Sequence, residues 1–115
     1  MGFKEKQKEV DDWILKYGRY WPPLSMFARL VEETGELGRE LNHVYGMKKR
    51  KEEEQIKPIE NEIGDILLTL IMISNFLKID LEDVFDKTMY KINARDKDRT
   101  KKWEFVYYKI NIFYI

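Results

Sequence analysis

Two short segments, each with two acidic residues three positions apart, constrain the fold of this chain more than any other feature. Glu33 and Glu36 form the first pair, and Glu62 and Asp65 form the second. A three-residue spacing stacks both acids of a pair on one face of a helix. Four carboxylates from two packed helices could form an oxygen-rich cage for a hard divalent cation such as Mg²⁺. The pattern therefore indicates helices and points to phosphate chemistry.

The rest of the chain predicts an all-α fold, a bundle of four main helices in which the two acid-bearing helices run antiparallel. Apolar residues recur at intervals of three and four in four stretches of the sequence. These stretches are residues 3–18, the segment from the Pro22-Pro23 break to about residue 45, 59–77 and 81–99. Gly18 and Gly46 are predicted to end the first two helices. The residues predicted to start or cap the later helices are Pro23, Ser25, Pro58 and Asp80.

Each predicted helix has one apolar face that is expected to point inward. The faces consist of Val10, Trp13, Ile14 and Tyr17; Phe27, Leu30, Val31, Leu37, Leu41 and Val44; Ile63, Ile66, Leu67, Leu70, Ile73 and Leu77; and Val84, Phe85, Thr88, Met89 and Ile92. Counting about 100° per residue places Glu62 within the buried arc of its helix and Asp65 on the border. Glu33 borders the arc of the second helix, and Glu36 lies farther out.

Burial of these acids would require an explanation, because an unpaired carboxylate costs several kcal/mol to bury. Buried carboxylates are therefore paired, protonated or bound to metal. A simpler alternative also stands. Because 37% of the residues are charged, each acid pair could belong to a solvated helix face.

Length and composition set the class of protein. A length of 115 residues predicts one domain, which we assign to residues 1–104, followed by an aromatic and β-branched tail at 105–115 of unknown role. The equal numbers of basic and acidic residues, 21 each, give no reason to expect nucleic acid or a membrane as partner. Cysteine is absent, which excludes thiolate catalysis and disulfides. No apolar stretch approaches about 20 residues, so we expect a cytoplasmic protein.

Several strings of the sequence resemble a known family. Leu30-Val-Glu-Glu-Thr-Gly-Glu-Leu37 followed by Glu62-Ile-Gly-Asp-Ile-Leu67 resembles the E-x-x-E, spacer, E-x-x-D signature of MazG-type all-α nucleoside triphosphate pyrophosphohydrolases. The strings 26–30, 39–46 and 91–99 resemble the short, single-domain MazG-like proteins of the YpjD type. The resemblance covers roughly residues 5–103 and leaves the tail outside.

The resemblance implies a function and a set of ligands. Glu33, Glu36, Glu62 and Asp65 would bind Mg²⁺, with Mn²⁺ as a substitute, and either Glu33 or Glu36 would orient the attacking water. The reaction would convert a nucleoside triphosphate, often a non-standard or deoxy form, to the monophosphate and pyrophosphate, as housekeeping of the nucleotide pool. Relatives are homodimers or homotetramers whose subunits complete each other's active sites.

Further residues are candidates for binding the substrate. Three cations and one amide near the end of the fourth helix could bind phosphate or sugar: Lys91, Asn93, Arg95 and Arg99. They could equally be a charged last turn that complements the helix dipole. Trp21, with Tyr20 and Phe27 nearby, could stack on the base, although aromatic residues around a Pro-Pro turn also serve as core.

Two rival functions remain open from the sequence. A non-catalytic helical interaction module would carry the same acids as solvated residues. A di-iron helix bundle is suggested by the Glu40-x-x-His43 pair, since such bundles use Glu-x-x-His motifs. The single histidine of the chain cannot complete that set in one subunit, so His43 is expected to be a hydrogen-bonding residue or to touch substrate.

Overall fold

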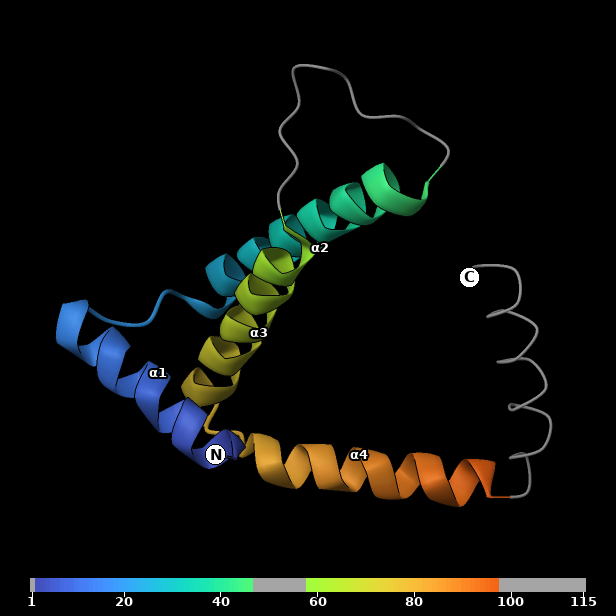
Figure 1. Ribbon diagram of the computed structural model, residues 1–115. Helices are drawn as coiled ribbons and strands as arrows, with labels where there is room; N and C mark the ends of the chain where they lie inside the picture. Colours follow the sequence, from blue (N-terminus) through green and yellow to red (C-terminus); the bar gives the residue numbers. More distant parts are fainter. Residues whose placement is uncertain (1, 47–57, 98–115) are drawn as a thin grey trace, which may run out of the picture. The chain divides into compact units, whose positions relative to one another are not determined.

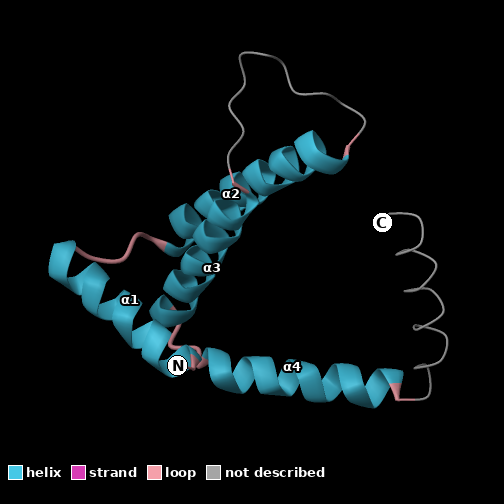
Figure 2. Cartoon of the chain, in the orientation of Figure 1, coloured by secondary structure: helices cyan, strands magenta, loops and turns pink. Residues whose placement is uncertain are grey.

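The computed structural model describes residues 2–46 and 58–97, and every regular element within these ranges is a helix (Figure 1, Figure 2). The helices are α1 (Phe3–Tyr17), α2 (Pro23–Tyr45), α3 (Ile59–Phe76) and α4 (Leu81–Asp96). The prediction of an all-α fold is confirmed. The predicted first and last residues of the first three helices agree with the structure to within one residue. The charged segment 47–57, Arg99 and the predicted tail at 105–115 lie outside the described residues.

The helix starts follow from proline geometry. Pro22 occupies the N-cap position of α2 and Pro23 its first turn, where the missing N–H of proline costs nothing. The N–H of Ser25 donates to Pro22 O at 2.9 Å, so Ser25 lies inside the first turn and the prediction that it caps the helix is wrong. Pro58 precedes α3 in the same way. At the other end of α2, the N–H of Gly46 donates to Asn42 O at 2.8 Å.

The chain divides into two compact units, one ending at Leu81 and the other beginning at Glu82. In the first unit α2 and α3 pack side by side and antiparallel, as predicted, and α1 packs against α3 (Figure 1). Ile14, Met26 and Met72 form the buried apolar cluster where the three helices meet. This cluster fixes the pairing of α2 with α3 at one end of their contact.

A polar network joins α1 to the turn after α3. Gln7 Nε2 donates to Asn75 Oδ1 at 3.0 Å and to Ile79 O at 2.8 Å. Gln7 Oε1 accepts the N–H of Leu81, the first residue of α4, at 3.0 Å. Asn75 Nδ2 in turn donates to Gln7 O at 2.9 Å. One glutamine therefore satisfies backbone groups that the turn between two helices leaves without intrahelical partners.

The prediction that the apolar faces point inward is wrong for many of their residues. Side chains predicted to be core are at least 40% exposed in this chain: Trp13, Tyr17, Phe27, Val31, Leu41, Val44, Ile63, Leu67, Leu70, Leu77, Val84, Phe85 and Met89. The physical reason lies in the register of α3. The buried residues of α3 are Glu62, Thr69, Ile71, Met72 and Ser74, whereas Ile63, Leu67, Leu70 and Leu77 of the predicted apolar stripe are exposed. Exposed apolar area of this kind is typical of interfaces between subunits.

Candidate functional site

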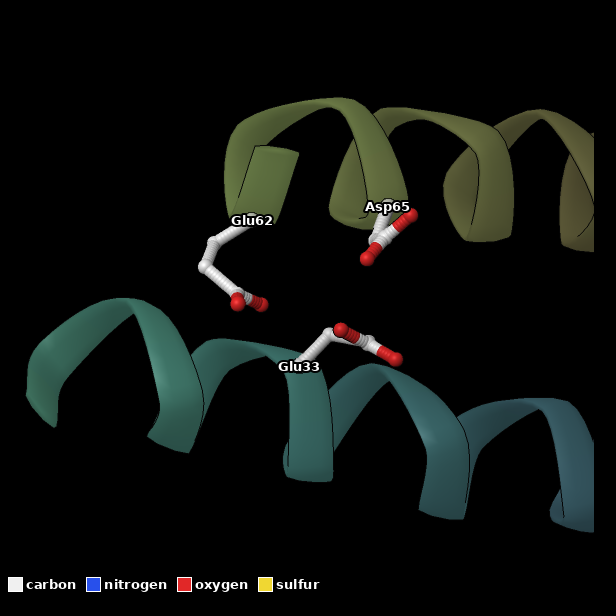
Figure 3. A group of neighbouring side chains, drawn as sticks. All are labelled: Glu33, Glu62 and Asp65. Carbon is white, nitrogen blue, oxygen red and sulfur yellow. The ribbon is translucent and has the colours of Figure 1, made fainter. Parts of the chain in front are cut away.

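The acid site arises where α2 and α3 face each other. Glu33 projects from the middle of α2, and Glu62 and Asp65 project from the first two turns of α3 toward it (Figure 3). One carboxylate oxygen from each residue lies within 4.8 Å of the others. Glu62 and Glu33 are only 2% and 8% exposed, and Asp65 is half-buried. We call these three residues the acid cluster.

The sequence places acids at this contact through a seven-residue repeat. The buried residues of α2 are Met26, Glu33 and Glu40. Seven residues are nearly two helical turns, so these positions lie along one face of α2. At the first of them the contact is apolar, since Met26 belongs to the same cluster as Met72 of α3. At the second of them the residue is Glu33, and its neighbours on α3 are the acids Glu62 and Asp65.

The acid cluster is electrostatically unfavourable without a cation. Burial, followed by the charges of Asp65 and Glu36, raises the pKa of Glu33 above its usual value. Arg29 and a hydrogen bond with Glu62 act in the opposite direction. Arg29 Nη2 lies 3.5 Å from Glu33 Oε1, while Glu33 Oε2 is buried and has no hydrogen-bond partner among the described residues. At Glu33, burial and the neighbouring acids therefore disfavour the charged carboxylate more than Arg29 and the hydrogen bond with Glu62 favour it.

The donor set fits a hard divalent cation. Carboxylate oxygens are the ligands that Mg²⁺ and related ions prefer, and a buried oxygen with no hydrogen bond could accept such an ion. The acid cluster contains no nitrogen ligand, because His43 is not part of it. A di-iron site built on Glu-x-x-His therefore finds no support at this cluster.

The fourth predicted acid, Glu36, is not part of the cluster. It lies one turn after Glu33 on α2 and is half-buried. Its charge raises the pKa of Glu33, so the two side chains interact. The structure thus brings together three of the four predicted metal ligands and leaves Glu36 at their edge, where it could contact a substrate or a water.

A cavity of about 360 Å³ is lined by residues of α1, the following turn, α2 and α3. Its aromatic walls are Trp13, Tyr17 and Trp21, and its charged residues are Arg19 and Arg29. Arg29 links this cavity to the acid cluster, since its guanidinium also lies over the Trp21 ring, 5.7 Å from the centroid. Flat aromatic walls suit a planar ring such as a nucleobase.

The aromatic residues near the Pro-Pro turn have different roles. Trp21 is 48% exposed and lines the cavity, and its stacking on a base stays a prediction. Tyr20 is structural, because its hydroxyl donates to Asp11 Oδ1 at 2.6 Å and its ring packs edge-on against Phe76. Burial, together with the bond to Asp11, raises the pKa of Tyr20 to about 12. Phe27 is exposed and is not among the residues that line the cavity.

The predicted phosphate-binding residues lie on α4, in the second unit. Lys91, Asn93 and Arg95 are exposed, and Arg95 forms a bidentate pair with Asp96 at 2.9 and 3.0 Å. Arg99 lies outside the described residues. Their binding to substrate stays a prediction.

Sequence reasoning missed two features of the site. Glu40 is 2% exposed, and its Oε2 lies 3.4 Å from His43 Nδ1, which agrees with a hydrogen-bonding role for His43. The seven-residue step from Met26 through Glu33 to Glu40 could have revealed this burial. Arg29 was also missed, although its position four residues before Glu33 predicts a helical ion pair.

The comparisons with known proteins point in one direction. The family model described as the MazG nucleotide pyrophosphohydrolase domain matches residues 22–100. The protein YpjD of Bacillus subtilis (strain 168) is 50% identical over 103 residues, which are 88% of this chain and 93% of YpjD. The nucleoside triphosphate pyrophosphohydrolase/pyrophosphatase MazG of Thermotoga maritima is 28% identical over 102 residues. That match covers 82% of this chain but only 40% of the Thermotoga protein.

Solved structures agree with the sequence matches. The crystal structure of YpjD from Bacillus subtilis superposes with a TM-score of 0.74 at 46% identity, covering 84% of this chain and 97% of that one. A Bacillus-conserved MazG protein, described as a nucleotide pyrophosphohydrolase, gives a TM-score of 0.70 at 47% identity. This match covers 85% of this chain and 96% of the chain of that MazG protein. Within residues 2–46 and 58–97, none of the helices has the length and apolar character needed to span a membrane.

Proposed function

The chain belongs to the MazG family of nucleotide pyrophosphohydrolases, and we propose that it hydrolyses a nucleoside triphosphate to the monophosphate and pyrophosphate with Mg²⁺ bound to Glu33, Glu62 and Asp65. The observation that carries this proposal is the acid cluster, whose three carboxylates converge between α2 and α3 (Figure 3). Mn²⁺ offers the same preference for oxygen ligands and is expected to substitute.

The charge of the substrate requires cations between it and the acid cluster. A triphosphate carries close to four negative charges and would be repelled by the acid cluster unless cations lay between them. When bound, such ions polarise phosphoryl oxygens and lower the pKa of a water. Glu33, Glu62 and Asp65 would hold the ions.

Glu36 is the residue that we assign to the attacking water. It is half-buried beside the acid cluster without belonging to it, so its carboxylate is available to orient a water and to take its proton. The water attacks the α-phosphorus, the bond to the bridging oxygen breaks, and pyrophosphate leaves. Glu33 is the alternative for this role, but its position within the cluster favours metal binding.

The rest of the substrate is assigned by chemistry. The cavity with Trp13, Tyr17 and Trp21 would take the base by stacking. Lys91, Asn93, Arg95 and Arg99 would bind phosphate oxygens or the sugar, since guanidinium and ammonium groups suit phosphates.

A panel of nucleoside triphosphates, incubated with Mg²⁺ and scored for pyrophosphate against orthophosphate, tests the reaction. We expect pyrophosphate and the monophosphate, and orthophosphate as the only product would contradict attack at the α-phosphorus. Glu36→Gln should lower kcat by about 10²-fold or more, the usual contribution of a general base. Glu32→Gln is the matched control, because Glu32 is an exposed acid on the same helix.

We further propose that the protein assembles as a homodimer or homotetramer and acts on the cytoplasmic nucleotide pool. Exposed apolar side chains on α2 and α3, such as Phe27, Ile63 and Leu67, support an interface between copies. Light scattering after size exclusion measures the mass directly, and a monomer at micromolar concentration would contradict the assembly.

A further inference from the structure

Arg29 touches both halves of the proposed site. Its guanidinium Nη2 lies 3.5 Å from Glu33 Oε1 in the acid cluster. The same guanidinium lies 5.7 Å from the centre of the Trp21 ring and lines the aromatic cavity. Its side chain is 42% exposed, whereas that of Glu33 is 10% exposed. Arg29 therefore has room to move, and Glu33 does not.

Arg29 and a divalent cation require the same partner. Both are positive, and both are attracted to the buried carboxylate of Glu33. Two cations on one carboxylate repel each other, so occupation of the acid cluster weakens the hold of Glu33 on Arg29. A partly exposed ion pair on one helix is weak enough to be exchanged in this way.

We propose that Arg29 couples the acid cluster to the aromatic cavity: it is the counter-ion of Glu33 in the metal-free protein, and a bound divalent cation releases it and changes its position over Trp21. This inference rests on the proposed function, since it takes the cluster as the cation site and the cavity as the base site. The released guanidinium presents its N–H donors to acceptor atoms of a base in the cavity, and the Trp21 face becomes accessible. Arg29 is thus a positioning residue that makes base binding depend on metal.

Thermodynamic linkage gives the proposal a measurable form. If cation binding displaces Arg29, then removal of the positive charge at residue 29 must favour cation binding. Arg29→Gln should bind Mn²⁺ about two- to five-fold more tightly by calorimetry, the range expected for the loss of a partly exposed ion pair. Arg29→Lys keeps the charge and should stay close to wild type. Arg19→Gln, which removes a charge from the cavity without an ion pair to Glu33, is the matched control.

A second measurement reports on the cavity without any turnover. In protein labelled with 5-fluorotryptophan, the ¹⁹F signal of Trp21, assigned with Trp21→Phe, should shift when Mg²⁺ is added. The shift should be lost in Arg29→Gln and kept in Arg19→Gln, because only the first variant lacks the group that moves. An uncharged nucleoside, which has no phosphate to bridge to the metal, should bind wild type more tightly with Mg²⁺ than without it.

The outcomes separate this inference from the proposed function. If the protein binds Mn²⁺ and releases pyrophosphate, but Arg29→Gln has wild-type Mn²⁺ affinity or the Trp21 signal is unmoved by Mg²⁺, the coupling role of Arg29 is overturned and the proposed function stands. If wild type neither binds Mn²⁺ nor releases pyrophosphate, the proposed function and this inference both fail. Tighter Mn²⁺ binding by Arg29→Gln, together with a Trp21 shift confined to proteins with Arg29, supports the inference.

Discussion

Replacement of Glu62 by Gln should stabilise the metal-free protein, although it removes a residue of the proposed metal site. Glu62 is 2% exposed. One of its carboxylate oxygens lies within 4.8 Å of a carboxylate oxygen of Glu33 and of one of Asp65. Two unit charges at about 4.8 Å repel each other by about 3.5 kcal/mol at an effective dielectric constant of about 20. In the fully ionised cluster the substitution removes two of the three pairwise repulsions. It keeps the shape of the side chain, and its amide can still donate a hydrogen bond to Glu33.

Proton uptake reduces the size of this effect. The wild-type cluster can hold one proton at neutral pH, which costs about 3 kcal/mol for a carboxyl with an ordinary pKa and removes two repulsions. The substitution then raises the free energy of unfolding by close to the energy of one pairwise repulsion. Solvent screening at the half-buried Asp65 lowers this increase to about 1–3 kcal/mol. For a chain of this size about 1 kcal/mol corresponds to about 4 °C in Tm.

Thermal unfolding followed by circular dichroism, with EDTA or with Mg²⁺, measures both consequences. Without metal, Glu62→Gln should melt at least about 4 °C above wild type. With Mg²⁺, wild type should gain stability by mass action, and the variant should gain little. Glu60→Gln, an exposed acid in the same first turn, is the control and should behave like wild type. A metal-free variant that melts below wild type, or an equal Mg²⁺ effect in both proteins, would refute the reasoning.

Two more predictions follow from the described contacts. Because the pKa of Glu33 is raised in the folded protein, the folded state holds its proton to higher pH than the unfolded state. Stability of the metal-free protein should therefore fall as pH rises from the ordinary carboxyl pKa through the folded one and level off above it; Tm measured against pH should show this slope, and Glu33→Gln should flatten it. Gln7→Ala removes side-chain hydrogen bonds to Asn75, Ile79 and Leu81, and urea unfolding should show a loss of about 1–3 kcal/mol. An unchanged midpoint in urea would mean that water replaces those bonds without cost.

Local geometry explains which parts of the site were predictable from sequence. Counting about 100° per residue predicted the burial of Glu62 and the intermediate position of Asp65 correctly, although Ile63, Leu67, Leu70 and Leu77 of the apolar arc used for the count are exposed. The antiparallel pairing of the two acid helices was also predicted, and the half-buried acids on both indicated that the helices face each other. The exclusion of Glu36 from the cluster depends on side-chain reach, which spacing does not determine.

The inward apolar faces failed for a different reason. That prediction placed the apolar side chains inside the bundle, whereas Ile63 and Leu67 are exposed and Glu40 is buried. Hydrophobicity alone cannot show which face of a helix meets which neighbour. The cavity was missed because it depends on the path of the turn between α1 and α2, which brings Trp13 next to Trp21.

The placement of the acids on two helices has a mechanical consequence. A cation held by Glu33 on α2 and by Glu62 and Asp65 on α3 would join the two helices near the start of α3. Without the cation, the contact between Met26 and Met72 would stabilise only the other end of the helix pair. The metal ions of the reaction would then also determine the stability of the α2–α3 pair. Depletion of metal would therefore inactivate the protein by destabilising its fold as well as by removing the ions needed for catalysis.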